Sequence, residues 1–331
     1  MDGKTIAKLF EVCGLEKPAA PAAPVSGGFM HRMYKVDTAA GSYAVKHLNL
    51  EVMKRPEAMA NYRRAERLEK IVGDAGIPIV SALEIRGRKM QEADGEYFYI
   101  FPWHSGRITD WYHITTEQCR KAGNIQGRIH AIPPGEVPHT EPEMSAIHWE
   151  EYIREAERQH SETAALLREN AALLEGAQDA LNCARQALPD IVCITDEDMD
   201  PKNVMWENGE PAVIDLECLG YGNPVSHALQ LSLQWSGITI CRPDPELQKA
   251  FLEGWLEAYD CGFRHFGSVL GLAYTWIEWL EYNIRRVLGK CADEKERETG
   301  TSEVRNTIRR IRCIRDNEDR IRQALVELQL L

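Results

Sequence analysis

The sequence lacks the features that mark several large classes of protein. Its nine cysteines are scattered and include no Cys-x-x-Cys pair, which argues against a disulfide framework and against a structural zinc site. No apolar run approaches the roughly 20 residues that a membrane helix needs. The first residues carry an acid early and lead into no long apolar stretch, so we expect no secretory signal. Together these absences favour a cytoplasmic protein with reduced thiols and no membrane partner.

Two further features are missing. The motif Gly-x-x-x-x-Gly-Lys-Ser/Thr does not occur, so a nucleotide site of the P-loop type is not indicated. There is also no excess of positive charge, because the formal net charge is −12, with +2 in residues 1–103 and −14 in the remainder. Such an acidic second part disfavours nucleic acid as a partner and is compatible with a cationic small molecule.

What is present is an ordinary globular composition. The 331 residues are 44% hydrophobic and 27% charged, which suits one large two-lobed domain or two ordinary domains. The patterning predicts a β-rich first third and a mostly helical remainder from about residue 115. This order indicates an α+β fold rather than alternating βαβ units. We place the lobe boundary after residue 101, giving lobes 1–101 and 102–331.

Within the first lobe we expect a hairpin over residues 31–48, a helix over 56–74, and further strands at 79–86 and 97–101. The helical part is interrupted by a strand-rich insert at 191–216, which contains Asn-Gly at 208–209. Asn-Gly is a strong signal for a tight hairpin turn. A hairpin centred there pairs position 203 with about 214.

This hairpin concentrates oxygen-bearing side chains. Asn203 and Asp215 must lie side by side at its open end, and Asp198 lies five residues earlier on the entering loop. One or two carboxylates with an amide oxygen suit Mg²⁺, which completes its shell with water and phosphate oxygens. A further carboxylate nearby can accept the proton of a substrate hydroxyl, as phosphoryl transfer requires. An acidic surface loop with an Asn-Gly turn is the simpler alternative.

The same residues resemble a known family. Asp198, four intervening residues and Asn203, followed by Ile-Asp-Leu-Glu at 214–217, look like the catalytic loop and metal motif of aminoglycoside phosphotransferases. That family has the bilobal protein-kinase-like fold, shared with choline kinases. The resemblance implies ATP and Mg²⁺ as cofactors, Asp198 as the catalytic residue that orients the hydroxyl, and Asn203 and Asp215 as metal ligands.

One position departs from the family pattern. Asp196 stands where the family usually has a histidine, and Glu197 stands where it usually has glycine. The extra carboxylate either raises the pKa of Asp198 or attracts a cationic substrate. Because the histidine is usually a structural organiser of the loop, we expect activity to be retained.

The first lobe supports the resemblance. Ser-Tyr-Ala-Val-Lys at 42–46 resembles the kinase strand that carries a phosphate-binding lysine. Alternation places Ala44 and Lys46 on one face, where the alanine admits the adenine and the ammonium reaches the phosphates. Glu66 on the following helix is expected to pair with Lys46, and Glu69, about one turn away, is the alternate.

Two segments resemble other parts of the nucleotide site. Ser26, Gly27 and Gly28 match the nucleotide-covering loop in position, although Gly-x-Gly-x-x-Gly is absent. Phe101 and Trp103 lie in a segment that looks like the hinge between lobes, whose backbone binds the adenine edge in the family.

The acceptor side depends on one helix near residues 274–286. Its acidic and aromatic residues can hold an ammonium group by ion pairing and cation–π attraction. The acceptor candidates on this helix are Trp276, Glu278, Trp279 and Glu281. Two further candidates, Asp196 and Glu217, lie elsewhere in the chain. An ordinary amphipathic helix with core tryptophans explains the same pattern.

From this we expect transfer of the γ-phosphate of ATP to a hydroxyl of a small, cationic, aminoglycoside-like molecule. Choline, an amino-sugar, homoserine or a thiamine-like acceptor are alternatives with the same chemistry. A nucleotide-binding pseudokinase acting as an interaction module is an alternative of another class. A metal hydrolase built on the acidic residues 196–200 is a third, but it has no histidine ligand beside the carboxylates and leaves Lys46 unexplained.

Overall fold

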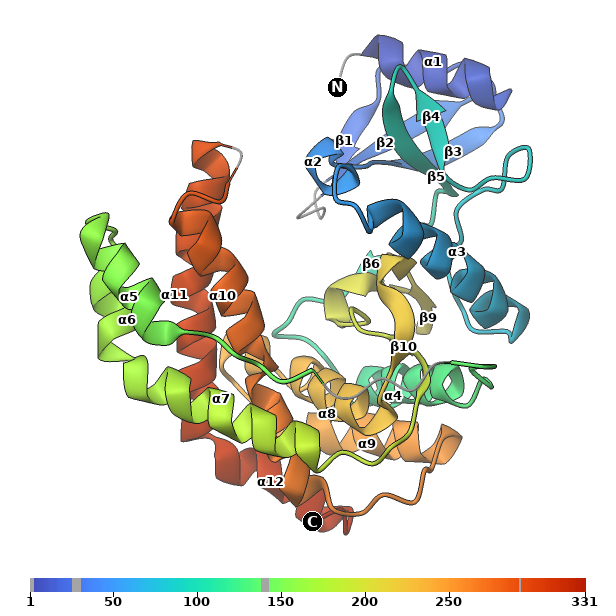
Figure 1. Cartoon of the computed structure of the whole chain (residues 1–331). Helices are drawn as coiled ribbons and strands as arrows, with labels where there is room; N and C mark the ends of the chain where they lie inside the picture. The colour runs from blue at the N-terminus through green and yellow to red at the C-terminus, as the bar shows by residue number, and fades with distance from the viewer. Residues whose placement is uncertain (1–2, 26–30, 138–142, 292) are drawn as a thin grey trace. The chain divides into compact units, whose positions relative to one another are not determined.

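The computed structural model divides the chain into two compact units, each made of two separate segments of sequence (Figure 1). The described residues are 3–25, 31–137, 143–291 and 293–331. The first unit comprises Met1–Thr109 and Asp196–Gly220, and the second comprises Asp110–Thr195 and Tyr221–Leu331. No helix among the described residues is both long enough and apolar enough to span a bilayer.

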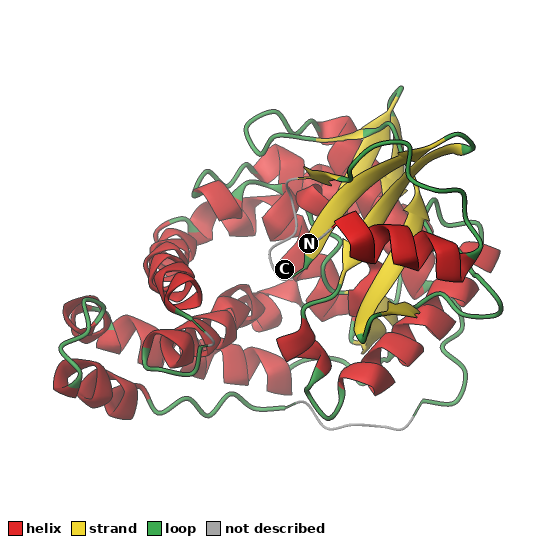
Figure 2. Ribbon diagram, turned by 90° about the horizontal axis from the view of Figure 1, so that it is seen from above, coloured by secondary structure: helices red, strands yellow, loops and turns green. Residues whose placement is uncertain are grey.

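The first unit is built on a five-stranded antiparallel sheet with the order β1-β2-β3-β5-β4 (Figure 2). Its strands are β1 (Ala23–Val25), β2 (Arg32–Thr38), β3 (Gly41–His47), β4 (Gln91–Ala93) and β5 (Glu96–Pro102). Gly41 has a φ of +147° at the β2–β3 turn, which a residue with a side chain rarely adopts. The predicted first hairpin is therefore present.

Apolar residues on one face of this sheet pack against helix α1 (Gly3–Cys13). Ile6, Leu9 and Phe10 of the helix are 2% exposed or less and form one cluster with Val45 and Ile100 of the sheet. The helix buries one apolar face, as the 3.6-residue periodicity of its sequence predicts. Helix α3 (Ala58–Asp74) and the short α2 (Leu50–Met53) follow β3.

The segment 79–86 does not form the strand that its composition predicts. It makes only isolated bridges, from Ile79 to Val213 and from Ile85 to Arg88, while β4 forms just after it. Val80 donates its amide to Val213 at 2.9 Å. The segment is extended because it joins two neighbouring layers of the unit, rather than because it lies in the main sheet.

A second sheet explains why the units divide the chain differently from the expected boundary after residue 101. Its order is β6-β8-β9, with β6 (Arg107–Ile108), β8 (Val204–Glu207) and β9 (Glu210–Val213). The inserted hairpin thus pairs with the end of the first segment. Residues 196–220 therefore belong to the sheet-containing unit, although the expectation placed the catalytic loop in the helical lobe.

The second unit is helical, with a two-stranded sheet of β7 (Cys193–Asp196) and β10 (Leu219–Gly222) where the chain enters and leaves it. Its helices are α4 (Thr116–His130), α5 (Trp149–Arg158), α6 (Ala164–Glu169), α7 (Ala171–Gln186), α8 (Pro224–Trp235), α9 (Pro245–Ala258), α10 (Trp276–Val287), α11 (Glu294–Asp316) and α12 (Glu318–Glu327). The stretch 149–182, for which the sequence pattern predicts one long helix or two shorter ones, lies in three helices. The expectation of an α+β fold, β-rich first and helical afterwards, is confirmed.

Close packing of α4 on α9 depends on glycine. A Cβ on Gly123 would overlap the carbonyl oxygen of Phe251, and a Cβ on Gly254 would overlap that of Arg120. The missing side chains let the two helix backbones approach each other, which larger residues prevent. This contact forms one wall of the helical core, in which Trp255 is only 1% exposed.

Candidate active site

The hairpin of β8 and β9 brings two predicted site residues together. Asn208 and Gly209 have φ values of 53° and 82°, the left-handed conformations that a two-residue turn of this kind requires. Val204 pairs with Val213, and the amide of Ile214 donates to the carbonyl oxygen of Asn203 at 2.9 Å. The predicted register is therefore confirmed, and Asn203 and Asp215 lie at the open end of the hairpin.

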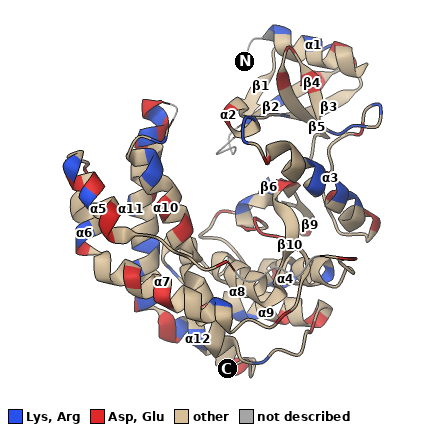
Figure 3. Cartoon of the chain, viewed as in Figure 1, with Lys and Arg blue, Asp and Glu red and all other residues tan. Residues whose placement is uncertain are grey.

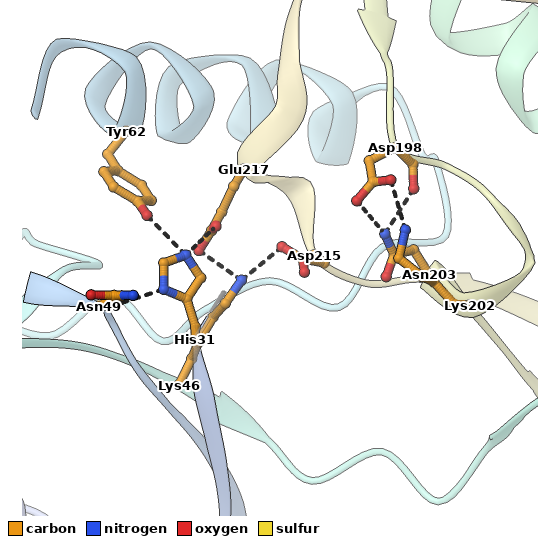
Figure 4. Close-up of polar contacts among 9 residues, drawn as sticks. All are labelled: His31, Lys46, Asn49, Tyr62, Asp198, Lys202, Asn203, Asp215 and Glu217. Carbon is orange, nitrogen blue, oxygen red and sulfur yellow. Dashed lines mark hydrogen bonds and ion pairs between the residues drawn. The ribbon is translucent and has the colours of Figure 1, made fainter. Parts of the chain in front are cut away.

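Asp215 itself has an unusual backbone conformation. Its φ of 61° and ψ of 59° are left-handed, and it leads into the short 3₁₀ turn Leu216–Cys218. A non-glycine residue in this region is strained and persists only where the surroundings hold it. The turn directs both Asp215 and Glu217 towards the same lysine (Figure 4).

Asp198 lies on the loop that enters the hairpin, and both of its carboxylate oxygens are engaged. The Nδ2 atom of Asn203 donates to Oδ2 at 2.9 Å and to the Asp198 carbonyl oxygen at 2.8 Å. Lys202 donates from Nζ to Oδ1 at 2.8 Å and to Asp200 at 2.8 Å. Burial alone would lower the pKa of Lys202, but the charges of Asp200 and Asp198 outweigh it and raise the pKa.

Lys202 was not among the residues predicted for the site. Its position four residues after Asp198 is the signal that could have identified it, because a tight loop brings such residues together. Its ammonium neutralises part of the negative charge that the acidic run 196–200 places on this loop.

The structure places Asp196 in the interior rather than on an acceptor surface. Its side chain is 1% exposed, and its Oδ1 accepts the amide of Asp198 at 3.2 Å. Burial, together with the nearby charges, raises its pKa to about 8. Asp196 therefore supports the loop through the amide of Asp198, and its burial argues against the expected contact with a substrate.

Lys46 on β3 is the buried cation of the unit. It is 5% exposed, and its Nζ lies 2.7 Å from Oδ1 of Asp215 and 2.7 Å from Oε1 of Glu217. Burial acts to lower its pKa, but these two carboxylates outweigh burial, so the pKa is raised. The lysine thus remains charged, and the predicted proximity of Lys46 and Asp215 is present.

Glu217 is also bound by a group that the sequence did not reveal. His31 places Nε2 at 3.2 Å from Oε2 of Glu217, while its Nδ1 accepts the amide of Asn49 at 3.0 Å. The hydroxyl of Tyr62 on α3 lies 3.2 Å from the same Nε2 (Figure 4). Glu217 is therefore a partner of Lys46, and its expected role as an acceptor contact is not what the structure shows.

The predicted ion pair between Lys46 and Glu66 is not formed. Glu66 accepts the hydroxyl proton of Tyr99 at 2.8 Å, and Glu69 pairs with Lys89 at 2.9 Å. Tyr99 on β5 is the cross-strand neighbour of Lys46 on β3, so both side chains point to the same side of the sheet. Glu66 therefore hydrogen-bonds to Tyr99 instead of pairing with Lys46. Glu66 and Lys46 nevertheless line one small cavity of about 30 Å³, which is the size of one water molecule.

The other predicted nucleotide contacts lie on the same sheet. Ala44 pairs with Phe101 between β3 and β5, and both residues are half-buried. Trp103 is 39% exposed, with its ring 5.0 Å from the Lys35 ammonium. Ser26, Gly27 and Gly28 lie outside the described residues.

The acceptor candidates on α10 have partners within the second unit. The guanidinium of Arg185 binds both oxygens of Glu278, at 2.8 and 2.9 Å, and Tyr152 and Arg285 bind Glu281. Both acidic and basic residues occur on α10 and α11 (Figure 3). These contacts favour the alternative of an amphipathic helix, since the charges of the two glutamates are already compensated.

The two tryptophans of α10 are likewise engaged. Trp276 lies under the guanidinium of Arg310, with 3.8 Å between the ring centroid and the central carbon. Trp279 donates from Nε1 to Glu303 at 2.9 Å and stacks on Tyr282. Both side chains therefore have partners on α10 or α11, which favours a packing role over the expected contact with an acceptor.

Comparison with known proteins supplies the family. The model of the phosphotransferase enzyme family matches residues 21–262. The fold resembles that of spectinomycin phosphotransferase APH(9)-Ia in complex with ADP and spectinomycin, at 15% identity, a TM-score of 0.66, and coverage of 99% of this chain and 98% of that chain. No curated protein matches the sequence.

Two further solved structures share the fold. One is amicoumacin kinase in complex with AMP-PNP and Ca²⁺, at 13% identity, a TM-score of 0.60, and coverage of 93% and 96% of the two chains. The other is a Plasmodium vivax ethanolamine kinase, at 13% identity, a TM-score of 0.58, and coverage of 87% and 81%. The expected kinase-like fold is confirmed, and the family match over most of the chain shows that this protein belongs to the phosphotransferase enzyme family and is an enzyme of that class.

Proposed function

We propose that the protein transfers the γ-phosphate of ATP, with Mg²⁺, to a hydroxyl of a small amine-bearing molecule. The observation that carries this proposal is the arrangement within the first unit. A buried lysine lies 2.7 Å from Asp215, and Asp215 lies beside Asn203, which binds Asp198. A cation for phosphates, a pair of oxygen ligands and a carboxylate for the hydroxyl are the parts that phosphoryl transfer needs.

The donor set of Asn203 and Asp215 fits Mg²⁺. Both N–H groups of the Asn203 amide are directed to Asp198, so the amide oxygen faces the other way and is presented as a ligand. Together with a carboxylate oxygen of Asp215, this gives the two hard oxygen ligands that Mg²⁺ takes beside water and phosphate. When bound, the metal would neutralise charge on the phosphates.

The side chains of this chain then have separate tasks. Lys46 binds phosphate oxygens, because its ammonium is held charged in a buried place. Asp198 orients the acceptor hydroxyl and takes its proton, with its carboxylate fixed by Asn203. Such positioning and charge compensation supply most of the catalysis in phosphoryl transfer. Ala44 and Phe101, paired on adjacent strands, are proposed to contact the adenine.

We further propose that the first unit binds the nucleotide and that the acceptor contacts come from the second part of the chain. A cationic acceptor is supported by the excess of acidic residues after residue 103 and by the amine in the name of the ethanolamine kinase. Since Glu278 and Glu281 are already paired, the attraction of a cation would come from other carboxylates.

The test is release of ADP from Mg·ATP with a panel of acceptors: ethanolamine, choline, homoserine, thiamine, and amino-sugar antibiotics including spectinomycin. We expect at least one to raise ADP release above the rate without acceptor. Asp198→Asn and Asp215→Ala should each lower that rate by about 10²-fold or more. Asp94→Asn, at an exposed turn of the first unit, is the matched control and should retain the rate.

The result that contradicts the proposal is full activity in both variants while their thermal unfolding matches the parent protein. Binding of ATP without ADP release, across the whole panel, would instead favour the pseudokinase alternative.

A further inference from the structure

The buried ammonium of Lys46 depends on two carboxylates from one short turn. Asp215 and Glu217 each lie 2.7 Å from its Nζ atom. A charge buried to this degree must be paired, because an unpaired one costs several kcal/mol. In the proposed function, Asp215 also binds the metal, and a carboxylate shared with a divalent cation attracts an ammonium less strongly. Glu217 is then the counter-charge that remains to hold the lysine in place.

Glu217 is itself fixed more firmly than a mobile surface acid. His31 accepts the backbone amide of Asn49 at Nδ1, so in the neutral ring the proton is on Nε2, which donates to Glu217 at 3.2 Å. The same carboxylate thus has His31 on one oxygen and the Lys46 ammonium on the other, at 3.2 and 2.7 Å.

Tyr62 completes this support. Its hydroxyl lies 3.2 Å from Nε2 of His31, and its side chain is 7% exposed. Because Nε2 carries the only ring proton, the Tyr62 hydroxyl shares that proton as a second acceptor and helps to orient the His31 ring, while Glu217 is bound by His31 itself (Figure 4).

Glu66 and Glu69, the two glutamates of α3 considered as partners of Lys46, bind other side chains. Glu66 binds the hydroxyl of Tyr99, and Glu69 is paired with Lys89. Tyr99 is 5% exposed, and its hydroxyl would lose its acceptor if Glu66 turned Oε1 towards Lys46. The two carboxylates that pair with Lys46 in the structure both come from the turn after β9 and not from α3.

We infer that Glu217, and not a glutamate of α3, positions Lys46 for the phosphates of the nucleotide, and that His31 and Tyr62 hold Glu217 for this purpose. The inference rests on the proposed function, since it assumes that Lys46 binds phosphates. Glu217 is a positioning residue, because it acts on the nucleotide through the lysine.

The experiment compares Glu217→Gln, Glu66→Gln and Lys46→Met by calorimetric binding of ADP with Mg²⁺ and by the KM for ATP against kcat. We expect Glu217→Gln to weaken nucleotide binding about tenfold, since it removes a charge-assisted interaction, with a smaller change in kcat. Glu66→Gln should change binding less than about twofold. Glu92→Gln, an exposed glutamate of β4, is the matched control for charge removal.

A double-mutant cycle separates positioning from a structural role. In the Lys46→Met background, Glu217→Gln should have no further effect on ADP binding, because the group it positions is gone. A merely structural glutamate would weaken binding equally in both backgrounds. If Glu217→Gln does not fold, Tyr62→Phe takes its place and should give a smaller weakening in the same direction.

Equal weakening by Glu66→Gln and Glu217→Gln overturns the inference, as does unchanged binding in both Glu217→Gln and Tyr62→Phe. A different result would contradict the proposed function itself. If the single variant Lys46→Met binds ADP as tightly as the parent protein, Lys46 does not bind the nucleotide, and the result says nothing about the role of Glu217.

Discussion

Glu278 of α10 is bound on both carboxylate oxygens by Arg185 of α7. Arg185 also donates to the carbonyl oxygen of Glu143 at 2.8 Å, and its side chain is only 16% exposed. A bidentate pair of this kind fixes two helices in one orientation. The residue is thus a link within the helical unit, whereas its sequence neighbourhood suggested an acceptor site.

We expect Arg185→Met and Glu278→Gln each to lower the free energy of unfolding by about 1 kcal/mol, the modest value expected of a partly exposed pair. The double variant should lose less than the sum of the two, which urea denaturation of all four proteins measures. Strictly additive losses would show that the pair contributes nothing, and Glu278 would again be a candidate for acceptor binding.

Glu66 shows why some residue roles could not be predicted from sequence. The positions of the two carboxylates and the amide were predictable from the register of a tight hairpin, and Lys46 was predicted from the resemblance of its strand to the kinase strand. Which acid meets Lys46 depends instead on Tyr99, whose hydroxyl takes Glu66. That choice is made by tertiary packing between helix and sheet, and residue spacing carries no information about it. The same holds for Arg185, which lies 93 residues from Glu278.

Helices α4 and α9 illustrate a contact between elements that glycine alone permits. A methyl group on Gly123 would overlap backbone atoms of Phe251, and backbone cannot move aside as a flexible side chain can. Gly176 on α7 is exposed, with no atom within 4 Å of the place its Cβ would occupy. The two glycines are therefore a matched pair for testing helix packing.

We expect Gly123→Ala to lower the free energy of unfolding by about 3 kcal/mol, through forced separation of the two helices. Gly176→Ala should raise it by about 0.5–1 kcal/mol, because alanine is the better helix former and meets no obstacle. Chemical denaturation of both variants measures this. If Gly123→Ala lowered the free energy of unfolding only slightly, α4 and α9 would be able to move apart without a large loss of packing.

Sequence patterns identified most elements here and misjudged some boundaries. The hairpin at Asn208 was predictable because its turn chemistry is local, and helices with one apolar face were predictable from periodicity. The segment 79–86 has the composition of a strand but pairs only through isolated bridges. Whether a segment pairs along its length depends on which strands lie beside it, and composition does not determine this. Similarly, the 149–182 stretch is broken into three helices at turns that its composition does not mark.

Among the described residues of the helical unit, His130 and His227 are buried and link its stability to pH. Burial lowers the pKa of His227 to about 4. Burial, with the nearby His227, lowers that of His130 well below its ordinary value. His130 must be neutral in the folded protein because its Nδ1 accepts the indole N–H of Trp255 at 2.9 Å, and a protonated ring has no acceptor. Both rings therefore favour folding only while uncharged.

The stability that His227 contributes should fall as the pH drops from about 6.5 towards 4. In that window the unfolded chain binds a proton at His227 and the folded chain does not, so acid favours unfolding by about 3 kcal/mol from this residue. His227→Gln should flatten the dependence, as measured by thermal unfolding between pH 4 and 7. Asp196, whose pKa of about 8 gives the opposite trend, is present in both proteins and cancels in the comparison. An identical slope in the variant would contradict this assignment.

The first unit is built from two segments that are far apart in the sequence, and this affects folding during translation. A ribosome that has released residues 1–109 has delivered the sheet and Lys46, but not Asp215 or Glu217. The ammonium then lacks the two carboxylates that pair with it in the folded protein, so its burial is not yet compensated by them. Completion of the amino-terminal half must wait until about one hundred further residues have been translated, and the helices α4 to α7 are synthesised in that interval.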